Sequence, residues 1–151
     1  MKAIINTQRG TMTAELYDDV PITTANFVKL AREHYYDGLH FHRVIPDFVV
    51  QGGCPHSRDM RNPMIGTGGP GYCIPCETDK GTHQYHDRGV LSMAHAGKNT
   101  GGSQFFICHC RQNTQHLDGV HTCFGKVVEG LEVIDMIRPG DLIESITISE
   151  N

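Results

Sequence analysis

Short apolar runs with the alternation of β-strands recur along almost the whole chain, and they constrain its fold more than any other feature. The first two, KAIIN and TMTAELY, flank the turn-like Gln8-Arg9-Gly10 and predict an N-terminal hairpin. The later runs are LHFHRVI, FVVQ, GVLSMA, SQFFICH, TCFGKVV and LIESITIS. Loops rich in Gly, Pro and Asn, notably residues 52–72 and 96–103, separate several of these runs.

Two segments have a helical period instead. ITTANFVKLAREHYYDG predicts a helix with Thr23 or Thr24 as its N-cap and Asp37-Gly38 as its end. VEGLEVIDMI predicts a second helix. Many strands with only two helices indicate a mainly β fold, an antiparallel barrel that is closed or nearly closed and has the helices over its ends. The order of the strands does not follow from these patterns.

Length and charge narrow the class of protein. With 151 residues the chain is expected to form a single domain, residues 1–151. The net charge of −4 provides no basic field, which argues against nucleic acid and against membranes as partners. The N-terminal MKAIINTQRG has too short an apolar run for a signal peptide, and no stretch has the length of a membrane span. A cytoplasmic protein is therefore expected.

The sequence contains no motif of nucleotide binding, serine hydrolysis or zinc proteolysis. GTGGPG, residues 66–71, has Pro70 where the helix of a phosphate-binding loop should begin, and neither G-x-S-x-G nor H-E-x-x-H occurs. The stretch that stands out is FHRVIPDFVVQGG, residues 41–53, in which Arg43 and Gln51 interrupt apolar runs. Apolar, amide, histidine and arginine side chains around loops suit non-covalent recognition better than bond cleavage.

Cysteine and histidine spacing offers an alternative. The six cysteines, at positions 54, 73, 76, 108, 110 and 123, lie in a chain without an export signal, so reduced thiols are expected rather than disulfides. Cys73-x-x-Cys76 is followed by His83-x-x-His86, which gives four potential zinc ligands in one segment, although both spacings are tight for a zinc finger. A zinc or redox sensor is therefore the weaker hypothesis, and the main hypothesis requires no metal and no cofactor.

Four motifs in order, together with the hairpin and the helix at ANFVKLA, carry a resemblance. FHRVIPDFVVQGG, GTGGPGY, LSMAHAGKNTGGSQFFI and HLDGVHTCFGKVVEG resemble the cyclophilin family of peptidyl-prolyl cis-trans isomerases. The match covers nearly the whole chain and is most similar to the single-domain prokaryotic members. The resemblance implies an eight-stranded antiparallel closed β-barrel capped by two α-helices. It also implies an isomerase, working as a monomer, whose partners are proline-containing polypeptides in folding.

The resemblance also gives roles to individual residues. Arg43 and Gln51 are expected to be catalytic and to face a groove outside the barrel, where Gln51 would hold the substrate carbonyl and orient Arg43. An X-Pro bond rotates slowly because amide resonance must be broken. Twisting the bond gives the proline nitrogen a basic lone pair, and the guanidinium could donate a hydrogen bond to it in the twisted state alone.

The remaining groove residues are expected to bind the substrate around the proline. The resemblance assigns the proline-ring pocket to Phe48, Val49, Phe106 and Leu117. It assigns the backbone before the proline to Ala94, His95 and Ala96. It assigns the wall of the neighbouring subsite to Gly66 and Gln104 and the far rim to His121, and it places His116 where the family frequently has a groove Trp.

Some positions depart from the family pattern. Many members have Met at Val49, Asn at His95 and Trp at His116, and this chain contains no Trp. Catalysis is expected to survive these changes, whereas cyclosporin, which the Trp helps to hold, is expected to bind weakly. A second hypothesis from the residues is a proline-peptide binding module or holdase, which would have no need for Arg43 and Gln51 together. The loop CPHSRDMRNPMI, residues 54–65, looks longer than in short-loop relatives.

Overall fold

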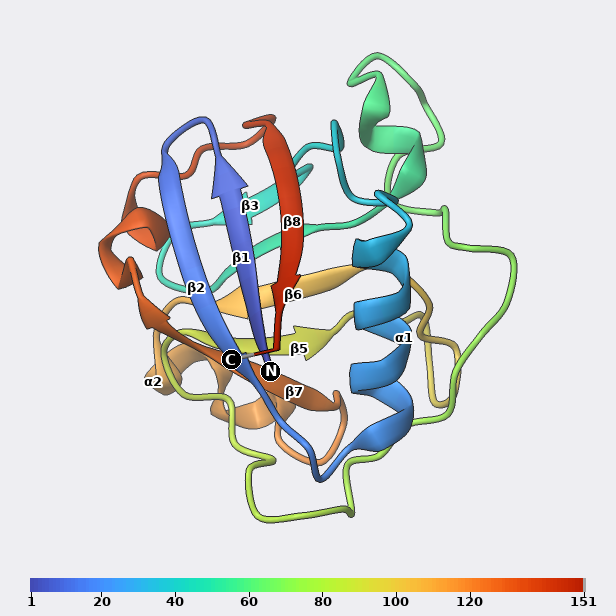
Figure 1. The fold of residues 1–151 in the computed structure, drawn as a ribbon, viewed down its shortest axis with the longest axis vertical. Coiled ribbons are helices and arrows are strands. Elements are labelled where there is room, and N and C mark those ends of the chain that lie inside the picture. Colours follow the sequence, from blue (N-terminus) through green and yellow to red (C-terminus); the bar gives the residue numbers. More distant parts are fainter. Residues whose placement is uncertain (151) are drawn as a thin grey trace.

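A computed structural model describes residues 1–150, and it places every strand in one antiparallel sheet that curls around a core (Figure 1). The strands are β1 Lys2–Thr7, β2 Gly10–Leu16, β3 Arg43–Ile45, β4 Val49–Gly52, β5 Val90–Met93, β6 Phe105–Cys108, β7 Cys123–Glu129 and β8 Ile143–Ser149. Their order in the sheet is β3-β4-β6-β5-β7-β2-β1-β8. The predicted hairpin is confirmed, since β1 pairs with β2 from Lys2↔Glu15 to Thr7↔Gly10.

The prediction of a closed barrel is wrong at one seam. Within residues 1–150 the edge strands β3 and β8 do not pair with each other. The seam is bridged just before both strands, where His40 and Leu142 form an isolated bridge and the Phe41 N–H donates to the Asp141 carbonyl at 2.9 Å. After Phe41 the chain turns away from this seam to pair with β4, so only the last three residues of LHFHRVI form a strand.

Alternation along the strands separates an inner core from an outer face. In β1 buried and half-buried residues alternate strictly, and Ala3 and Ile5 point into the core. The strands β4, β5 and β6 are buried on both faces. Their inner residues join the main core, while their outer residues contribute to a second, smaller cluster formed by Val49, Val90, Phe106, Cys108 and Cys123. This second group is called the outer cluster below.

The first helix, α1 (Pro21–Arg32), lies along one side of the curled sheet (Figure 1). Its N-cap is Val20, so the predicted cap at Thr23 or Thr24 is wrong; the Thr23 hydroxyl instead donates to the buried Glu77 carboxylate at 2.7 Å. The helix also ends before Asp37, because His34 has a left-handed φ of 61° that turns the chain.

The second predicted helix, over VEGLEVIDMI, is wrong as an α-helix. Residues up to Glu129 stay paired in β7, and Gly130 breaks the strand with a φ of 78°. The chain then forms the short 3-10 helix η3 (Leu131–Asp135), on the side opposite α1 (orange-red in Figure 1). Its Val133 and Ile134 are buried in the core, so the segment covers the sheet as expected with a shorter element.

Three further helical turns lie in the loops. These are η1 (Pro55–Arg58), the one-turn α2 (Arg111–Thr114) and η2 (Gln115–Leu117). The sequence did not predict α2 and η2, although η2 carries two of the expected site residues, His116 and Leu117. Across residues 1–150, no helix combines the length and the apolar character needed to cross a bilayer.

Candidate functional site

Strand pairing places three of the expected site residues in one row across the outer face of the sheet. Arg43 of β3 lies opposite Gln51 of β4, and Gln51 lies opposite Phe106 of β6. Phe106 in turn lies opposite Ser92 of β5. Because residues directly opposite each other in a sheet point to the same face, all of these side chains project outward together. Arg43 and Gln51 can thus interrupt the apolar runs of the sequence because their side chains lie on this outer face and not in the main core.

The polar end of this row forms a hydrogen-bond relay. Arg43 Nη1 donates to Gln51 Oε1 at 3.1 Å, and Gln51 Nε2 donates to Gln104 Oε1 at 3.1 Å. Gln104 Nε2 then donates to the carbonyls of Gly66 and Gly68, at 3.0 and 2.9 Å. Backbone carbonyls can only accept, so they fix the orientation of the Gln104 amide and, through it, that of Gln51. The acceptor end of Gln51 consequently faces Arg43.

The Arg43 guanidinium is held on one side and open on the other. Its carbon Cζ lies 6.0 Å from the centroid of the Phe48 ring, a cation–π distance. Nη1 bonds to Gln51, and within the described residues neither Nε nor Nη2 has a protein partner. Arg43 therefore keeps oriented donors for a ligand beside an aromatic wall.

The apolar end of the row is the outer cluster and the residues packed against it. Phe48, Ala94 and Leu117 pack on the cluster and are half-buried. Phe106 is 4% exposed and Val49 is 2% exposed, so both lie at the bottom of the apolar surface, whereas the half-buried Phe48 and Leu117 are nearer to solvent. His116 stacks on Phe48 with ring centroids 5.9 Å apart.

A groove of about 670 Å³ adjoins the relay. Its size is typical of a small-ligand site, for which about 300–1,000 Å³ is usual. It contains six of the expected residues, namely Gln51, Gly66, Ala94, His95, Ala96 and Gln104. Phe48, Phe106, His116, Leu117 and His121 do not line it. The expected site therefore divides into this groove and a separate apolar patch, and Gln51 and Ala94 lie where the two meet.

The groove also has walls that the sequence did not assign. These are Thr67, Gly68, Gly69, Pro70, Gly71, Tyr72, Cys73, Thr100, Gly102 and Ser103. Most of them belong to the motif GTGGPGY, from which only Gly66 was selected. The motif could have indicated these wall residues from the sequence, since a loop of small residues leaves room for a ligand near the backbone.

Two histidines stack between the groove and the apolar patch. The rings of His95 and His121 lie 4.1 Å apart between centroids, and His121 meets the edge of Phe106 at 5.4 Å. Nδ1 of His121 lies 2.8 Å from the Met93 carbonyl and donates to it. Burial is the main reason that the pKa of His121 lies below the ordinary histidine value. His121 beside Phe106 is consequently neutral at pH 7.

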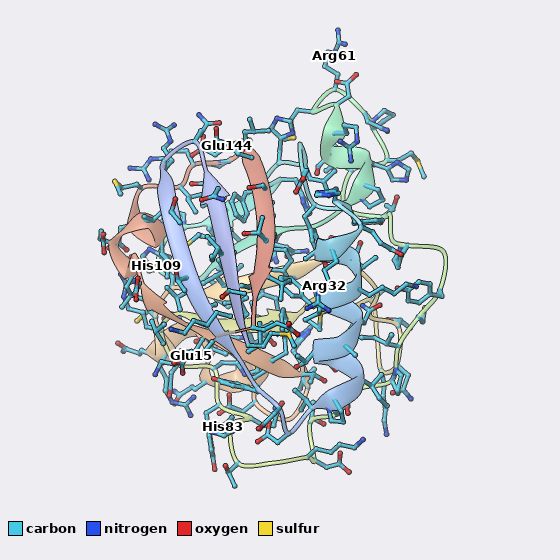
Figure 2. The ribbon with its side chains drawn as sticks, in the orientation of Figure 1. Glu15, Arg32, Arg61, His83, His109 and Glu144 are labelled. Atoms are coloured by element: carbon cyan, nitrogen blue, oxygen red, sulfur yellow. The ribbon has the colours of Figure 1, made fainter. Side chains whose placement is uncertain are left out.

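Three of the four residues of the zinc hypothesis are held by different partners, and the fourth, Cys73, is an exposed residue of the groove wall. Nδ1 of His83 lies 2.7 Å from the Asp19 carboxylate, at the loop-rich edge of the molecule in Figure 2. His86 is buried against Asp118, and Cys76 Sγ accepts from the Asn99 N–H at 3.3 Å. In the described part of the chain, no three His, Cys, Asp or Glu side chains are arranged to hold a metal ion. All six cysteines are free thiols in the structure.

Comparison with known proteins gives consistent results. Residues 2–150 match the model of the family described as cyclophilin type peptidyl-prolyl cis-trans isomerase/CLD. The chain is 55% identical to a peptidyl-prolyl cis-trans isomerase of Synechococcus elongatus, over 97% of this chain and 95% of that protein. It is 57% identical to peptidyl-prolyl cis-trans isomerase B of Bacillus subtilis, over 89% of this chain and 87% of the relative.

A solved structure agrees in fold. The crystal structure of a Cryptosporidium parvum cyclophilin type peptidyl-prolyl cis-trans isomerase in the presence of the dipeptide Ala-Pro superimposes with a TM-score of 0.85. The two sequences are 30% identical, and the match covers 100% of both chains.

Proposed function

This chain belongs to the cyclophilin-type peptidyl-prolyl cis-trans isomerases, and we propose that it isomerises X-Pro bonds where the Arg43 relay meets the outer cluster. Members of this family bind proline-containing peptides. One observation carries the proposed location: Arg43 is oriented by Gln51, keeps two donors free, and lies beside an apolar surface. That combination suits a proline ring whose nitrogen must be reached by a hydrogen-bond donor.

The proposed chemistry depends on how the amide changes as the bond twists. In the planar amide the proline nitrogen shares its lone pair with the carbonyl, and the rotation barrier is about 18–20 kcal/mol. In the twisted state the lone pair returns to the nitrogen, which becomes an acceptor for Arg43. A bond that exists in the twisted state alone lowers the barrier, whereas one present throughout merely tightens binding. No proton is transferred and no covalent intermediate forms in this mechanism.

The energy required shows that Arg43 cannot act alone. An acceleration of about 10⁵ corresponds to roughly 7 kcal/mol of differential stabilisation. One oriented donor typically contributes about 3–4 kcal/mol. The rest would come from holding the proline ring against Phe48, Phe106 and Leu117, away from water, with the carbonyl before it held by Gln51.

The groove of about 670 Å³ is proposed to hold the residues that precede the proline. Ala94, His95 and Ala96 form one wall and offer main-chain groups, while Gly66 and Gln104 form the other. The solved relative crystallised with Ala-Pro supports a proline dipeptide as the minimal ligand. A proline-limited refolding assay, or isomerisation of a short Ala-Pro peptide by purified protein, tests the activity. Line broadening of Phe106 and Gln51 signals on peptide addition tests the location.

A first prediction concerns the relay. Gln104→Leu removes both the acceptor for Gln51 and the donor to the loop carbonyls, so the Gln51 amide can turn its nitrogen toward Arg43. Losing one such hydrogen bond, worth about 1 kcal/mol, should lower kcat/KM of an Ala-Pro peptide roughly five-fold. Gln104→Glu is the matched control, because a carboxylate still accepts from Gln51 but cannot donate to Gly66. We expect it to keep kcat and to raise KM, and equal kcat for both variants would contradict the relay.

A second prediction concerns His116 and cyclosporin. His116 is exposed and stacks on Phe48, so a larger ring there would extend the apolar surface. A gain of about 50–80 Å² of apolar contact at roughly 25 cal/mol per Å² is worth 1–2 kcal/mol, or about ten-fold in affinity or more. His116→Trp should therefore tighten cyclosporin inhibition at least about ten-fold, while turnover of an Ala-Pro peptide changes much less. Equal inhibition of both proteins would show that this position does not set drug affinity.

Three further expectations stay predictions. A cytoplasmic location can be tested by fractionation, a monomer by sedimentation, and one cooperative domain over residues 1–151 by calorimetry. The role in protein folding depends on clients that carry exposed X-Pro bonds. A holdase would bind such clients without accelerating their isomerisation, whereas the isomerase accelerates it and should lose most of that acceleration when Arg43 is removed.

A further inference from the structure

Behind the outer cluster, His86 occupies a buried position that the proposed isomerisation does not use. Its side chain is 0% exposed; Nδ1 lies 2.8 Å from Oδ1 of Asp118, and Nε2 lies 2.8 Å from Oγ of Ser92. Aspartate, histidine and serine are linked in this order in serine hydrolases. Here Ser92 is itself 0% exposed, so no substrate can reach its hydroxyl. The three residues therefore do not form a nucleophilic site.

The partners of His86 fix its proton positions. Asp118 also accepts from the His86 N–H at 2.8 Å and from Arg111 Nη2 at 2.9 Å. Although burial would raise it, these hydrogen bonds hold the pKa of Asp118 below its ordinary value, so the carboxylate can only accept. Nδ1 of His86 must then carry a proton.

The second ring nitrogen is the acceptor. Burial lowers the pKa of His86 below the ordinary histidine value, and the bond to Asp118 opposes this shift without reversing it. The ring is thus neutral at pH 7. Nε2 accepts from the Ser92 hydroxyl, which lies nearer to it, at 2.8 Å, than to its other acceptor, the Thr122 carbonyl at 3.2 Å. Both ring nitrogens are satisfied without a buried positive charge.

The His86 ring connects the parts of the proposed proline pocket. It lies parallel to Phe106, with centroids 5.9 Å apart and 16° between the planes, and so backs the pocket wall. Asp118 directly follows η2, the turn that carries Leu117, and Leu117 packs against the outer cluster that contains Phe106. Ser92 lies opposite Phe106 in the neighbouring strand. One side chain therefore stacks on Phe106 and, through Asp118, anchors the turn that carries Leu117.

We propose that His86 is a positioning residue for isomerisation, which with Asp118 and Ser92 holds Phe106 and Leu117 at the spacing that a proline ring requires. The inference rests on the proposed location of the proline pocket. His86 does not touch the substrate. Because the pocket walls contact the proline ring in both the planar and the twisted state, their misalignment should weaken both states alike. Loss of His86 is then expected to raise KM more than it lowers kcat.

The test compares His86→Leu, which removes both hydrogen bonds and the stacked ring, with Ile5→Val in the main core. For an Ala-Pro peptide, His86→Leu should raise KM about ten-fold and lower kcat less than about three-fold. A protein that is only less stable loses active molecules, so its apparent kcat falls and its KM does not change. Ile5→Val, buried in β1 away from the groove, is expected to show that second pattern or no change.

Asp118→Ala removes the hydrogen bond between Asp118 and His86 from the other partner. Asp118 is only half-buried, so this variant still tests the proposal if His86→Leu does not fold. If His86 and Asp118 act as a unit, the variant that combines His86→Leu with Asp118→Ala should have a KM no higher than that of His86→Leu alone. In the intact protein, nitrogen NMR should show His86 neutral with the proton on Nδ1. An unchanged KM in the folded variants, or a proton on Nε2, would overturn the positioning role. An inactive wild-type protein would instead overturn the proposed function.

Discussion

Arg43→Ala should lower kcat/KM for an Ala-Pro peptide about 100-fold, since removal of one oriented donor to a developing charge or lone pair costs about 10²–10³ in rate. The loss should appear mainly in kcat, because the bond to the proline nitrogen exists in the twisted state alone. Stability should change by no more than about 0.5 kcal/mol, since the side chain is exposed on the outer face. Peptide isomerisation and urea denaturation on the same sample measure both effects.

Two variants control this result. Arg61→Ala removes an arginine that is 91% exposed at the tip of the 54–65 loop (Figure 2) and does not line the groove, so it should leave kcat/KM unchanged. Arg43→Lys keeps the charge but loses the planar fork and the hydrogen bond geometry to Gln51. We expect it to recover only a small part of the activity. Near wild-type kcat/KM in folded Arg43→Ala would remove the basis of the proposed mechanism.

Phe27→Ala should have the largest effect on stability, a loss of about 3–5 kcal/mol in the free energy of unfolding. Phe27 is fully buried where α1 meets the sheet, and its ring contacts those of Tyr36, Phe105 and Phe124 at 4.9 to 5.5 Å between centroids. The substitution leaves a cavity and removes three aromatic pairs, each worth about 0.5–1.5 kcal/mol beyond burial. Chemical denaturation followed by circular dichroism measures the change.

Phe48→Ala is the matched control for Phe27→Ala. Its side chain is half-buried against the outer cluster, so truncation should cost much less stability but should impair proline binding and raise KM. The remaining folded fraction of Phe27→Ala should have a nearly normal KM. A loss of less than about 1 kcal/mol in Phe27→Ala would mean that the core relaxes around the cavity, contrary to this account.

The sequence by itself determined the strands, the first helix and the chemical character of the groove. Alternation along KAIIN and TMTAELY predicted a hairpin that the structure confirms, because side-chain periodicity is a local property. The same local signal was misleading where tertiary contacts compete with it. VEGLEVIDMI has a helical period, yet pairing with β2 keeps its first residues in β7. LHFHRVI has a strand-like pattern throughout, yet only its last three residues form β3, and His40 before them makes an isolated bridge to Leu142.

Only the tertiary structure decided how distant residues meet. The sequence motifs contain Arg43, Gln51 and Gln104 but do not show which of them bonds to which. Strand register places Arg43 beside Gln51, and the two loop carbonyls that accept from Gln104 decide which end of each amide donates. Likewise, the sequence spacing suggested that His86 and His83 bind zinc together, whereas in the structure His86 is hydrogen-bonded to Asp118 and Ser92 behind Phe106. Hydrogen-bond partners far apart along the chain leave no periodic trace in the sequence, because their pairing depends on which strands become neighbours.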